Sequence, residues 1–286
     1  MQASFLSIYL LPMAIAIIMV GLGLSLTPAD FKRIIQYPKA MIIGLITQMV
    51  ILPLICLLIA QYFELSPVLA VGLMLLAAAP GGPSANLYSH MAGGDVALNV
   101  SLTALNSVLS IFSIAWIVNF SLAYFMKAEA YVPLQFQKVL EVCAMIITPI
   151  CIGMWVRHRF PDFALRMDRP VKLVSGLFLA LLIILAGLKE IDHLMEDIQT
   201  VGAAALSFNL ACLVVGYFLP RLFQLPPKQA VAISMEVGIH NGSLAIYIAL
   251  SILNQGEMTI PAVVYSLIMF ITAAIFAIWS QKKLTE

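Results

Sequence analysis

Long apolar runs alternate with short polar connections along this chain of 286 residues. Each run is about 20 residues or longer, the length that an α-helix needs to cross the hydrocarbon core of a bilayer. The runs lie at residues 3–26, 39–62, 66–91, 95–126, 133–156, 170–188, 199–222, 227–254 and 259–281. The pattern therefore predicts an all-α membrane protein with nine transmembrane helices.

Two of these segments contain residues that interrupt a helix. The third holds Pro80-Gly81-Gly82-Pro83, and a proline inside a helix removes a donor and clashes with the preceding turn. The eighth holds Gly238 and Gly242. Broken helices persist at membrane depth only where they are buried in protein or line a wet cavity. We therefore expect both breaks to face the interior.

Polar side chains converge at one depth. Glu236 lies about 15 Å along its helix from Pro226, at 1.5 Å per residue, which is near the bilayer midplane. Gln48 of the second segment has a similar depth. The fourth segment adds a polar stripe on one helical face: Asn99, Thr103, Asn106 and Ser110. We expect these groups to form one buried polar layer.

The composition supports a membrane environment, because 62% of the residues are hydrophobic and 10% are charged, against about half and about a quarter in soluble domains. The net charge of +1 gives no sign of a nucleic-acid partner. The four cysteines lie in apolar runs without CxxC spacing, so neither disulfides nor a metal cluster is expected. No HExxH or GxSxG motif indicates an enzyme, and nothing indicates an obligate protein partner.

Lysine and arginine predict the orientation. One set of loops, with the C-terminal tail, holds all but three of the 15 lysines and arginines. The positive-inside rule then places the N-terminus outside and the C-terminus in the cytoplasm, in the cell (inner, cytoplasmic) membrane. In this orientation the two broken segments cross in opposite directions. We therefore expect an inverted repeat of residues 1–126, with four spans and no leading helix, and residues 127–286, with five spans.

The polar layer suits ion binding. A carboxylate at mid-membrane costs about 2.5–3.5 kcal/mol, and no lysine or arginine is expected at the depth of Glu236. It must therefore be protonated or neutralised by a bound cation. Amide and hydroxyl oxygens suit Na⁺, and half-helix N-termini near Ser84 and Asn241 suit an anion. This chemistry indicates a cation-coupled carrier of a small organic anion, in preference to an enzyme, a receptor or a channel.

Four stretches resemble the bile acid:sodium symporter family, in the form of its bacterial-type members: TQMVILP, PGGPSAN, GGDVALNVSLTALNSVLS and EVGIHNG. The resemblance covers essentially the whole chain. It implies a core domain of spans about 66–126 and 227–281 with contacts from 39–62, and a panel domain of the remaining spans. It also implies two sodium sites and a substrate cavity beside the crossing of the broken helices.

The resemblance assigns residues to each site. The first sodium site would use Asn86, Asn99, Thr103 and Glu236, together with the residue at Ala85. The second would use Gln48, Glu236, His240 and the carbonyls of Val237 and Ile239. Substrate contacts would come from Pro83, Ser84, Asn241 and Gly242.

Three residues depart from the family pattern. Ala85 and Asn99 each stand where a serine is usual, and Asn99 could supply the oxygen that Ala85 lacks. His240 stands where a glutamine is expected, and it offers a nitrogen in place of a carbonyl oxygen. We therefore predict sodium-coupled symport of an organic anion, bile-acid-like or a small carboxylate, into the cell by alternating access. The alternative is a proton-coupled or exchange carrier of the same fold, in which a proton on His240 replaces the second sodium.

Overall fold

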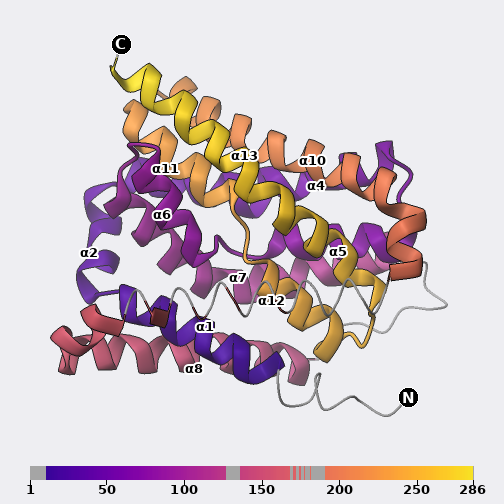
Figure 1. Cartoon of the computed structure of the whole chain (residues 1–286), viewed down its shortest axis with the longest axis horizontal. Coiled ribbons are helices and arrows are strands. Elements are labelled where there is room, and N and C mark those ends of the chain that lie inside the picture. The colour runs from indigo at the N-terminus through magenta and orange to yellow at the C-terminus, as the bar shows by residue number, and fades with distance from the viewer. Residues whose placement is uncertain are drawn as a thin grey trace.

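The computed structural model describes residues 11–126, 136–167 and 191–285, together with residues 170, 171, 174, 177 and 181. Within these residues every regular element is a helix, and strand-like pairing is confined to one bridge between Gly81 and His240 (Figure 1). The all-α class is therefore confirmed. Most of the predicted span 170–188 lies outside the described residues, as do residues 3–10 of the first span.

The helices follow the predicted apolar segments. The first half contains α1 (Leu11–Ser25), α2 (Pro28–Gln36), α3 (Pro38–Ile46), η2 (Thr47–Ile51), α4 (Leu52–Tyr62), α5 (Pro67–Ala78), α6 (Pro83–Met91) and α7 (Val96–Phe125). The second half contains α8 (Phe136–Arg159), α10 (Ile191–Leu222), α11 (Pro227–Gly238), α12 (Gly242–Tyr247), η3 (Ile248–Ile252), η4 (Glu257–Thr259) and α13 (Ile260–Thr285).

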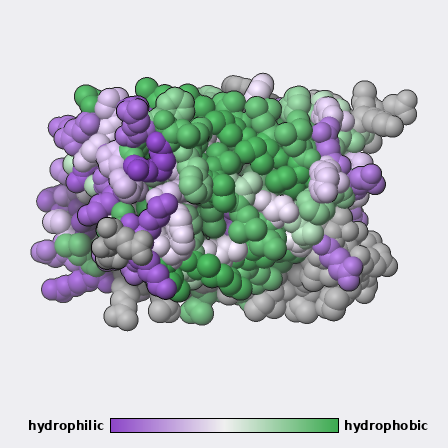
Figure 2. All heavy atoms as spheres, turned by 90° about the horizontal axis from the view of Figure 1, so that it is seen from above, coloured by the Kyte–Doolittle hydropathy of each residue, from purple (hydrophilic) through white to green (hydrophobic). Residues whose placement is uncertain are grey.

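Several helices are long and apolar enough to cross a membrane. Among the described residues, five meet this condition by length and composition: Pro38–Tyr62, Val96–Phe125, Leu140–Arg159, Val201–Leu222 and Glu257–Leu284. Shorter apolar helices span Ile15–Ser25, Pro67–Ala78 and Gly242–Ile252. Figure 2 shows a hydrophobic band between two hydrophilic ends. Phe112 and Trp116 of α7 are 71% and 72% exposed, which suits a surface in contact with lipid.

The span Pro38–Tyr62 contains a π-helical turn that the sequence did not lead us to expect. Pro53 has no N–H to donate to the carbonyl four residues earlier. The preceding N–H, of Leu52, bonds instead to the Thr47 carbonyl, five residues back. The wider turn covers Thr47–Ile51 and therefore contains Gln48. Such π-turns often occur at functional sites.

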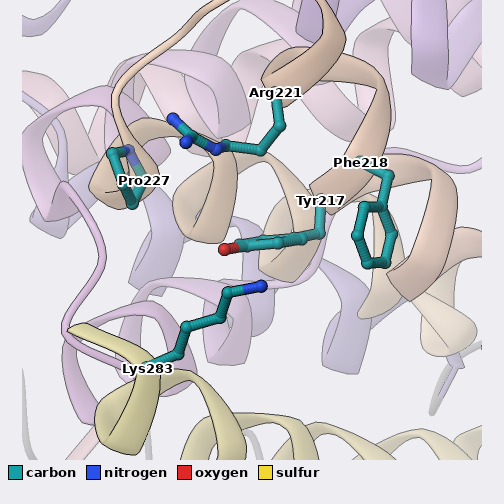
Figure 3. A pocket seen from close by; sticks show the side chains of 5 residues that line it. All are labelled: Tyr217, Phe218, Arg221, Pro227 and Lys283. Atoms are coloured by element: carbon teal, nitrogen blue, oxygen red, sulfur yellow. The ribbon is translucent and has the colours of Figure 1, made fainter. Parts of the chain in front are cut away.

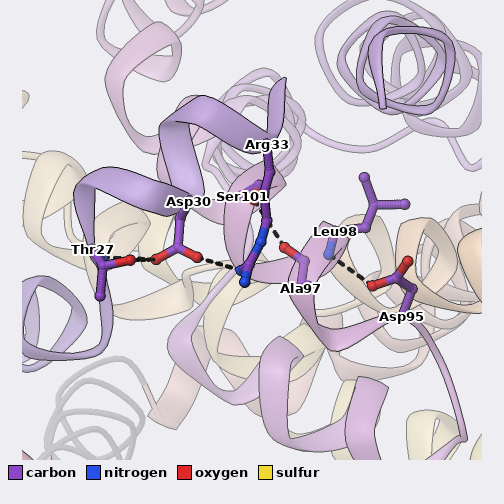
Figure 4. Close-up of polar contacts among 7 residues, drawn as sticks. All are labelled: Thr27, Asp30, Arg33, Asp95, Ala97, Leu98 and Ser101. Atoms are coloured by element: carbon purple, nitrogen blue, oxygen red, sulfur yellow. Dashed lines mark hydrogen bonds and ion pairs between the residues drawn. The ribbon is translucent and has the colours of Figure 1, made fainter. Parts of the chain in front are cut away.

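The short helix α2 was also not predicted. Asp30 accepts hydrogen bonds from the Thr27 N–H and Oγ1, both at 2.7 Å, which forms a capping arrangement at the helix start. Its other oxygen pairs with Arg33 at 2.7 Å (Figure 4). In the same view Asp95 caps α7 by accepting from the Leu98 N–H at 3.1 Å. The spacing of Thr27 and Asp30 was the available sequence signal.

Two groups of helices are evident from their packing. α1 packs along α8 on one side of the molecule (Figure 1). A Cβ on Gly23 would lie 2.3 Å from the Ile150 carbonyl, and one on Gly153 would lie 2.4 Å from the Val20 carbonyl. The two glycines thus permit close approach of α1 and α8. In the other group, α10 packs against α11 and α13, and α5 packs against α7.

Candidate ion-binding crossover

The two helix breaks lie where proline and glycine predicted them, and they pair with each other. α5 ends at Ala78 and α6 begins at Pro83, while α11 ends at Gly238 and α12 begins at Gly242. The short connections run antiparallel. The Gly82 N–H donates to the Ile239 carbonyl at 2.8 Å, and the Asn241 N–H donates to the Pro80 carbonyl at 2.9 Å. Each break therefore satisfies backbone groups that the other leaves free, as a buried site requires.

Local chemistry fixes where the second half of each broken helix starts. Proline suits the first turn of α6, where an N–H would have no helical partner. Asn241 caps α12, because its Oδ1 accepts from the Leu244 N–H at 3.1 Å and from the Ser243 hydroxyl at 2.8 Å. The sequence thus sets both helix starts at the crossing.

Glu236 lies at the centre of this crossing and is fully buried. Its Oε2 accepts from Thr103 Oγ1 at 2.5 Å, and its Oε1 accepts from Asn106 Nδ2 at 3.0 Å. The backbone of Gly81 also contacts this carboxylate, and a Cβ at Gly81 would lie 2.4 Å from the carboxyl carbon. Neither ion pair found among the described residues includes Glu236. The carboxylate is thus held by neutral donors from α7 and the first break.

Buried amide oxygens without a partner occur on the helices that meet at the crossing and on α7. Asn99 Nδ2 donates to the Ala232 carbonyl at 2.7 Å, which leaves Asn99 Oδ1 without a hydrogen bond. In the described part of the chain, the buried side-chain oxygens without a partner are Gln48 Oε1, Asn86 Oδ1, Ser89 Oγ, Asn99 Oδ1, Asn106 Oδ1 and Ser266 Oγ. Leaving such a group unsatisfied costs about 1–3 kcal/mol. A cation bound among the amide oxygens would remove that cost.

Gln48 and His240 meet at the first break. Gln48 Nε2 donates to the carbonyls of Ala77 and Ala79, at 3.2 and 3.0 Å. His240 Nδ1 lies 3.1 Å from the same Ala79 carbonyl, so this nitrogen carries the proton, and Nε2 lies 3.8 Å from Cys212 Sγ. The ring also stacks on Phe208, with centroids 5.7 Å apart. Both ring nitrogens thus have protein partners.

The predicted substrate residues lie at the starts of α6 and α12. Ser84 is half-buried on α6, and Asn241 is 4% exposed with its Nδ2 lacking a partner. Gly242 lies close to α13, since a Cβ there would be 2.2 Å from Ser266 Oγ. Pro83 is the first residue of α6. Ala85 is fully buried and brings no side-chain oxygen.

Asn106 is the residue that sequence reasoning placed in the stripe but did not assign to the site. It is fully buried and bonds directly to Glu236. Its position three residues after Thr103, on the same helical face, was the available signal.

A cavity of about 360 Å³ separates the α1–α8 pair from α6 and α7. Its lining residues are Leu24, Ser25, Asn86, Leu87, His90, Val96, Val100, Arg157 and Leu165. Asn86, which the resemblance assigns to the first sodium site, lines this cavity, and His90 and Arg157 bring basic side chains to it.

Comparison with known proteins extends these observations. The family model described as the sodium bile acid symporter family matches residues 12–197. The human "P3 protein" is 32% identical over 249 residues, which is 84% of this chain and 50% of that protein. The chain thus spans about half the length of the P3 proteins it matches. The "uncharacterized sodium-dependent transporter YocS" of Bacillus subtilis is 25% identical over 99% of this chain and 85% of its own length. The mouse "sodium/bile acid cotransporter 4" is 28% identical over 93% of this chain and 62% of its own length.

Proposed function

Because this chain belongs to the sodium bile acid symporter family, we propose that it is a sodium-coupled symporter that moves an organic anion into the cell. Family membership confirms the resemblance seen in the sequence and the interpretation as a multi-pass membrane transporter, not an enzyme. Relatives named as sodium-dependent transporters or cotransporters support the choice of Na⁺ as the coupling ion. Substrate, direction and residue roles are our proposal.

The proposal rests on the set of groups that contact the Glu236 carboxylate. Among the described residues this fully buried carboxylate has only neutral donors as partners, and Oδ1 of Asn99 and of Asn106 on α7 have no partner. Oxygen atoms of carboxylate, amide and hydroxyl groups form the donor set that a hard monovalent cation prefers. We assign the ion to Glu236, Thr103, Asn99 and Asn86, and add Asn106 as a group that holds the carboxylate in place.

The second predicted sodium site offers fewer free oxygen ligands than the first. Gln48 Oε1 has no partner, but the Ile239 carbonyl already accepts the Gly82 N–H. His240 directs a proton at the Ala79 carbonyl and its other nitrogen at Cys212. We therefore propose that one Na⁺ binds tightly at Glu236, and that Gln48, Val237 and Ile239 bind a second ion weakly at most.

The anion would bind where α6 and α12 begin. Asn241 has a buried N–H₂ group without a partner, which is a donor for a carboxylate. Ser84 is on the adjoining helix start, and Asn86, two residues along the same helix α6, lines the cavity that His90 and Arg157 also line. Bile-acid-like molecules and small carboxylates both fit this chemistry. A bound Na⁺ would fix the crossing, so that the anion binds better when the ion is present.

Alternating access would follow from the two groups of helices. The α1–α8 pair would form the panel, and the crossing helices α5, α6, α11 and α12, with α7 and α13, would form the core. The sequence placed residues 199–222 with the panel, but the packing of α10 against α11 and α13 favours its movement with the core. Inverted halves that rock about a fixed midplane site are a general solution for such carriers.

Thermal unfolding of the detergent-purified protein tests sodium binding. Selective binding of Na⁺ to the folded state raises its stability by mass action, by about 2.7 kcal/mol at 100 times the dissociation constant. We expect NaCl to raise the melting temperature, KCl and choline chloride at equal ionic strength to leave it unchanged, and Glu236→Gln to abolish the response. A stability that ignores Na⁺ and instead follows pH in the wild type, with loss of that dependence in His240→Gln, would favour the proton-coupled alternative.

A further inference from the structure

A second cavity lies away from the crossing, where the end of α10, the start of α11 and the end of α13 meet. Its volume is about 260 Å³, and it is lined by Tyr217, Phe218, Arg221, Pro227 and Lys283. One water molecule occupies only about 30 Å³ in the liquid. Figure 3 shows the guanidinium of Arg221 and the ammonium of Lys283 on opposite sides of the Tyr217 ring, with Pro227 facing the guanidinium.

The two cations at this cavity are not neutralised by the described part of the chain. Neither ion pair found there includes Arg221 or Lys283. Arg221 donates from Nη1 to the Leu225 carbonyl at 2.6 Å, and a guanidinium has further N–H groups to offer. Lys283 Nζ lies 5.5 Å from the ring centroid of Tyr217 and 5.0 Å from that of Trp279. The aromatic rings therefore hold the ammonium in place without cancelling its charge.

The surface around the cavity is apolar and exposed. Phe218 and Leu222 of α10 are 49% and 77% exposed, and Ile278 of α13 is 61% exposed. Arg221 and Lys283 lie in the last turns of these same helices. Each of these helices has an apolar, exposed surface and ends in aromatic and basic residues. Such residues are typical of the place where a helix leaves the hydrocarbon and enters the headgroup region. The cavity therefore borders both regions of a bilayer.

We propose that this cavity binds the phosphate group of an anionic membrane phospholipid. The planar guanidinium of Arg221 can bind two phosphate oxygens, and Lys283 supplies a point charge. The acyl chains would lie over Phe218 and Leu222. Free phosphate would use only the charged part of this surface, whereas a phospholipid uses the charged and the apolar parts together. The site joins α10, α11 and α13, and it is distinct from the ion site at Glu236.

Native mass spectrometry of the full chain in a neutral detergent tests this proposal. Phosphatidylglycerol is titrated as the anionic lipid and phosphatidylcholine as the zwitterionic one. A basic residue that contacts the headgroup of a bound anionic lipid contributes about a fivefold gain in affinity. We expect R221Q and K283Q each to weaken phosphatidylglycerol binding about fivefold, and the double variant to weaken it about 25-fold. K283R keeps the point charge and should stay within about threefold of the wild type. R221K keeps the charge but loses the two-oxygen contact, so its affinity should fall between those of the wild type and R221Q.

The matched control removes the same charge elsewhere at the basic end. Lys32 is exposed on α2, and Arg159 is exposed with its guanidinium over the Phe160 ring, 5.7 Å from the centroid. The double variant K32Q/R159Q should bind phosphatidylglycerol as the wild type does. Equal binding of phosphatidylcholine, or an equal loss in this control, would overturn the proposal.

Two further outcomes keep the test decisive. Soluble glycerol phosphate that displaces the lipid at equal concentration would assign the cavity to free phosphate and refute the lipid. If the Gln variants melt early without lipid, the decision rests on K283R, because loss of phosphatidylglycerol binding in this charge-conserving variant would also refute the proposal. The sodium-dependent rise in melting temperature at Glu236 is measured separately, so failure of the lipid site leaves the proposed transport function untouched.

Discussion

Gly81 is the residue on which the geometry of the ion site depends most directly. A Cβ there would meet both the carboxyl carbon and Oε1 of Glu236 at 2.4 Å. We expect Gly81→Ala to push the carboxylate away from Thr103 and Asn106, to lower stability by about 1–3 kcal/mol, and to abolish the sodium-dependent rise in melting temperature.

Gly202 provides the control for this substitution, because a Cβ there meets nothing within 4 Å. Gly202→Ala lies within helix α10 and should raise stability by up to about 1 kcal/mol, with the sodium response unchanged. A sodium response of wild-type size in Gly81→Ala would contradict the assignment of the ion to Glu236.

His240 sets the expected sodium stoichiometry. An amide carbonyl at this position would add an oxygen ligand beside Gln48, where the imidazole offers a proton to Ala79 and a nitrogen to Cys212. We expect the Hill slope for sodium-dependent transport to rise from about one in the wild type toward two in His240→Gln. The melting temperature should fall, because the ring contacts with Phe208 and Tyr265 are lost.

Cys212→Ala is the control for His240→Gln. It removes the contact to Nε2 without adding an oxygen, so the slope should stay near one. A wild-type slope near two would show that His240 does not limit the second site.

At the residue scale, the burial of the polar stripe on residues 99–110 was predictable from helical spacing alone. The direct bond from Asn106 to Glu236 was not, because spacing gives the face of a helix but not its rotation against a neighbour. The partners of the two His240 nitrogens are the Ala79 carbonyl, directly after α5, and Cys212 of α10, and no local pattern in EVGIHNG could indicate them.

At the element scale, the start of α12 combines two roles in one residue. Asn241 Oδ1 caps the helix, whereas Nδ2 has no partner in the described structure and is our donor for the substrate anion. Asn241→Asp keeps the capping oxygen but removes the donor and adds a negative charge. We expect it to raise the substrate KM by tenfold or more, since hydrogen bonds to charged groups are worth about 1.5–3 kcal/mol.

Asn241→Ala should lose both roles, with an added cost in stability of about 1 kcal/mol. Ser66 caps α5 by accepting from the Leu69 N–H at 3.4 Å, far along the chain from the crossing, and serves as the control. Ser66→Ala should lower stability without changing KM. A normal KM in Asn241→Asp would remove this residue from the substrate site.

The breaks in α5–α6 and α11–α12 were predictable because proline and glycine act on the backbone locally. The bridge between Gly81 and His240 was not, because it joins residues far apart in the sequence. Helix α2 is short and polar, so it forms no apolar run in the sequence, and its signal is limited to the Thr27–Asp30 cap. The π-turn at Thr47–Ile51 depends on Pro53, which lies beyond the turn itself.

At the scale of the whole molecule, the hydrophobic pattern predicts apolar segments but does not indicate which helices pack against each other. A helix in lipid is apolar on the side facing lipid and on the side facing protein, so burial leaves little signal in the sequence. The packing of α10 against α11 and α13, and of α1 against α8, appears only in the structure. The glycines at positions 23 and 153 are a partial signal, since small residues permit close helix contact in membranes.

The cavity between these two groups of helices gives a test of the anion path. Arg157 comes from α8 and faces a cavity whose other wall includes Asn86 and His90 of α6. Removing this charge should weaken attraction of an anion without touching the ion site. We expect Arg157→Gln to raise the substrate KM by about threefold to tenfold, and this increase should become smaller at high ionic strength. The sodium-dependent rise in melting temperature should stay as in the wild type.

Arg159→Gln is the matched control, because it removes an equal charge two residues away. The Arg159 side chain is exposed and packs over Phe160, and it does not line the cavity. The KM of the Arg159→Gln variant should therefore match that of the wild type at every salt concentration. Equal effects of the two variants would mean that the general field of the basic end attracts the anion. A change confined to Arg157 would instead place the substrate between the α1–α8 pair and the crossing helices, where movement of one group against the other opens and closes its path.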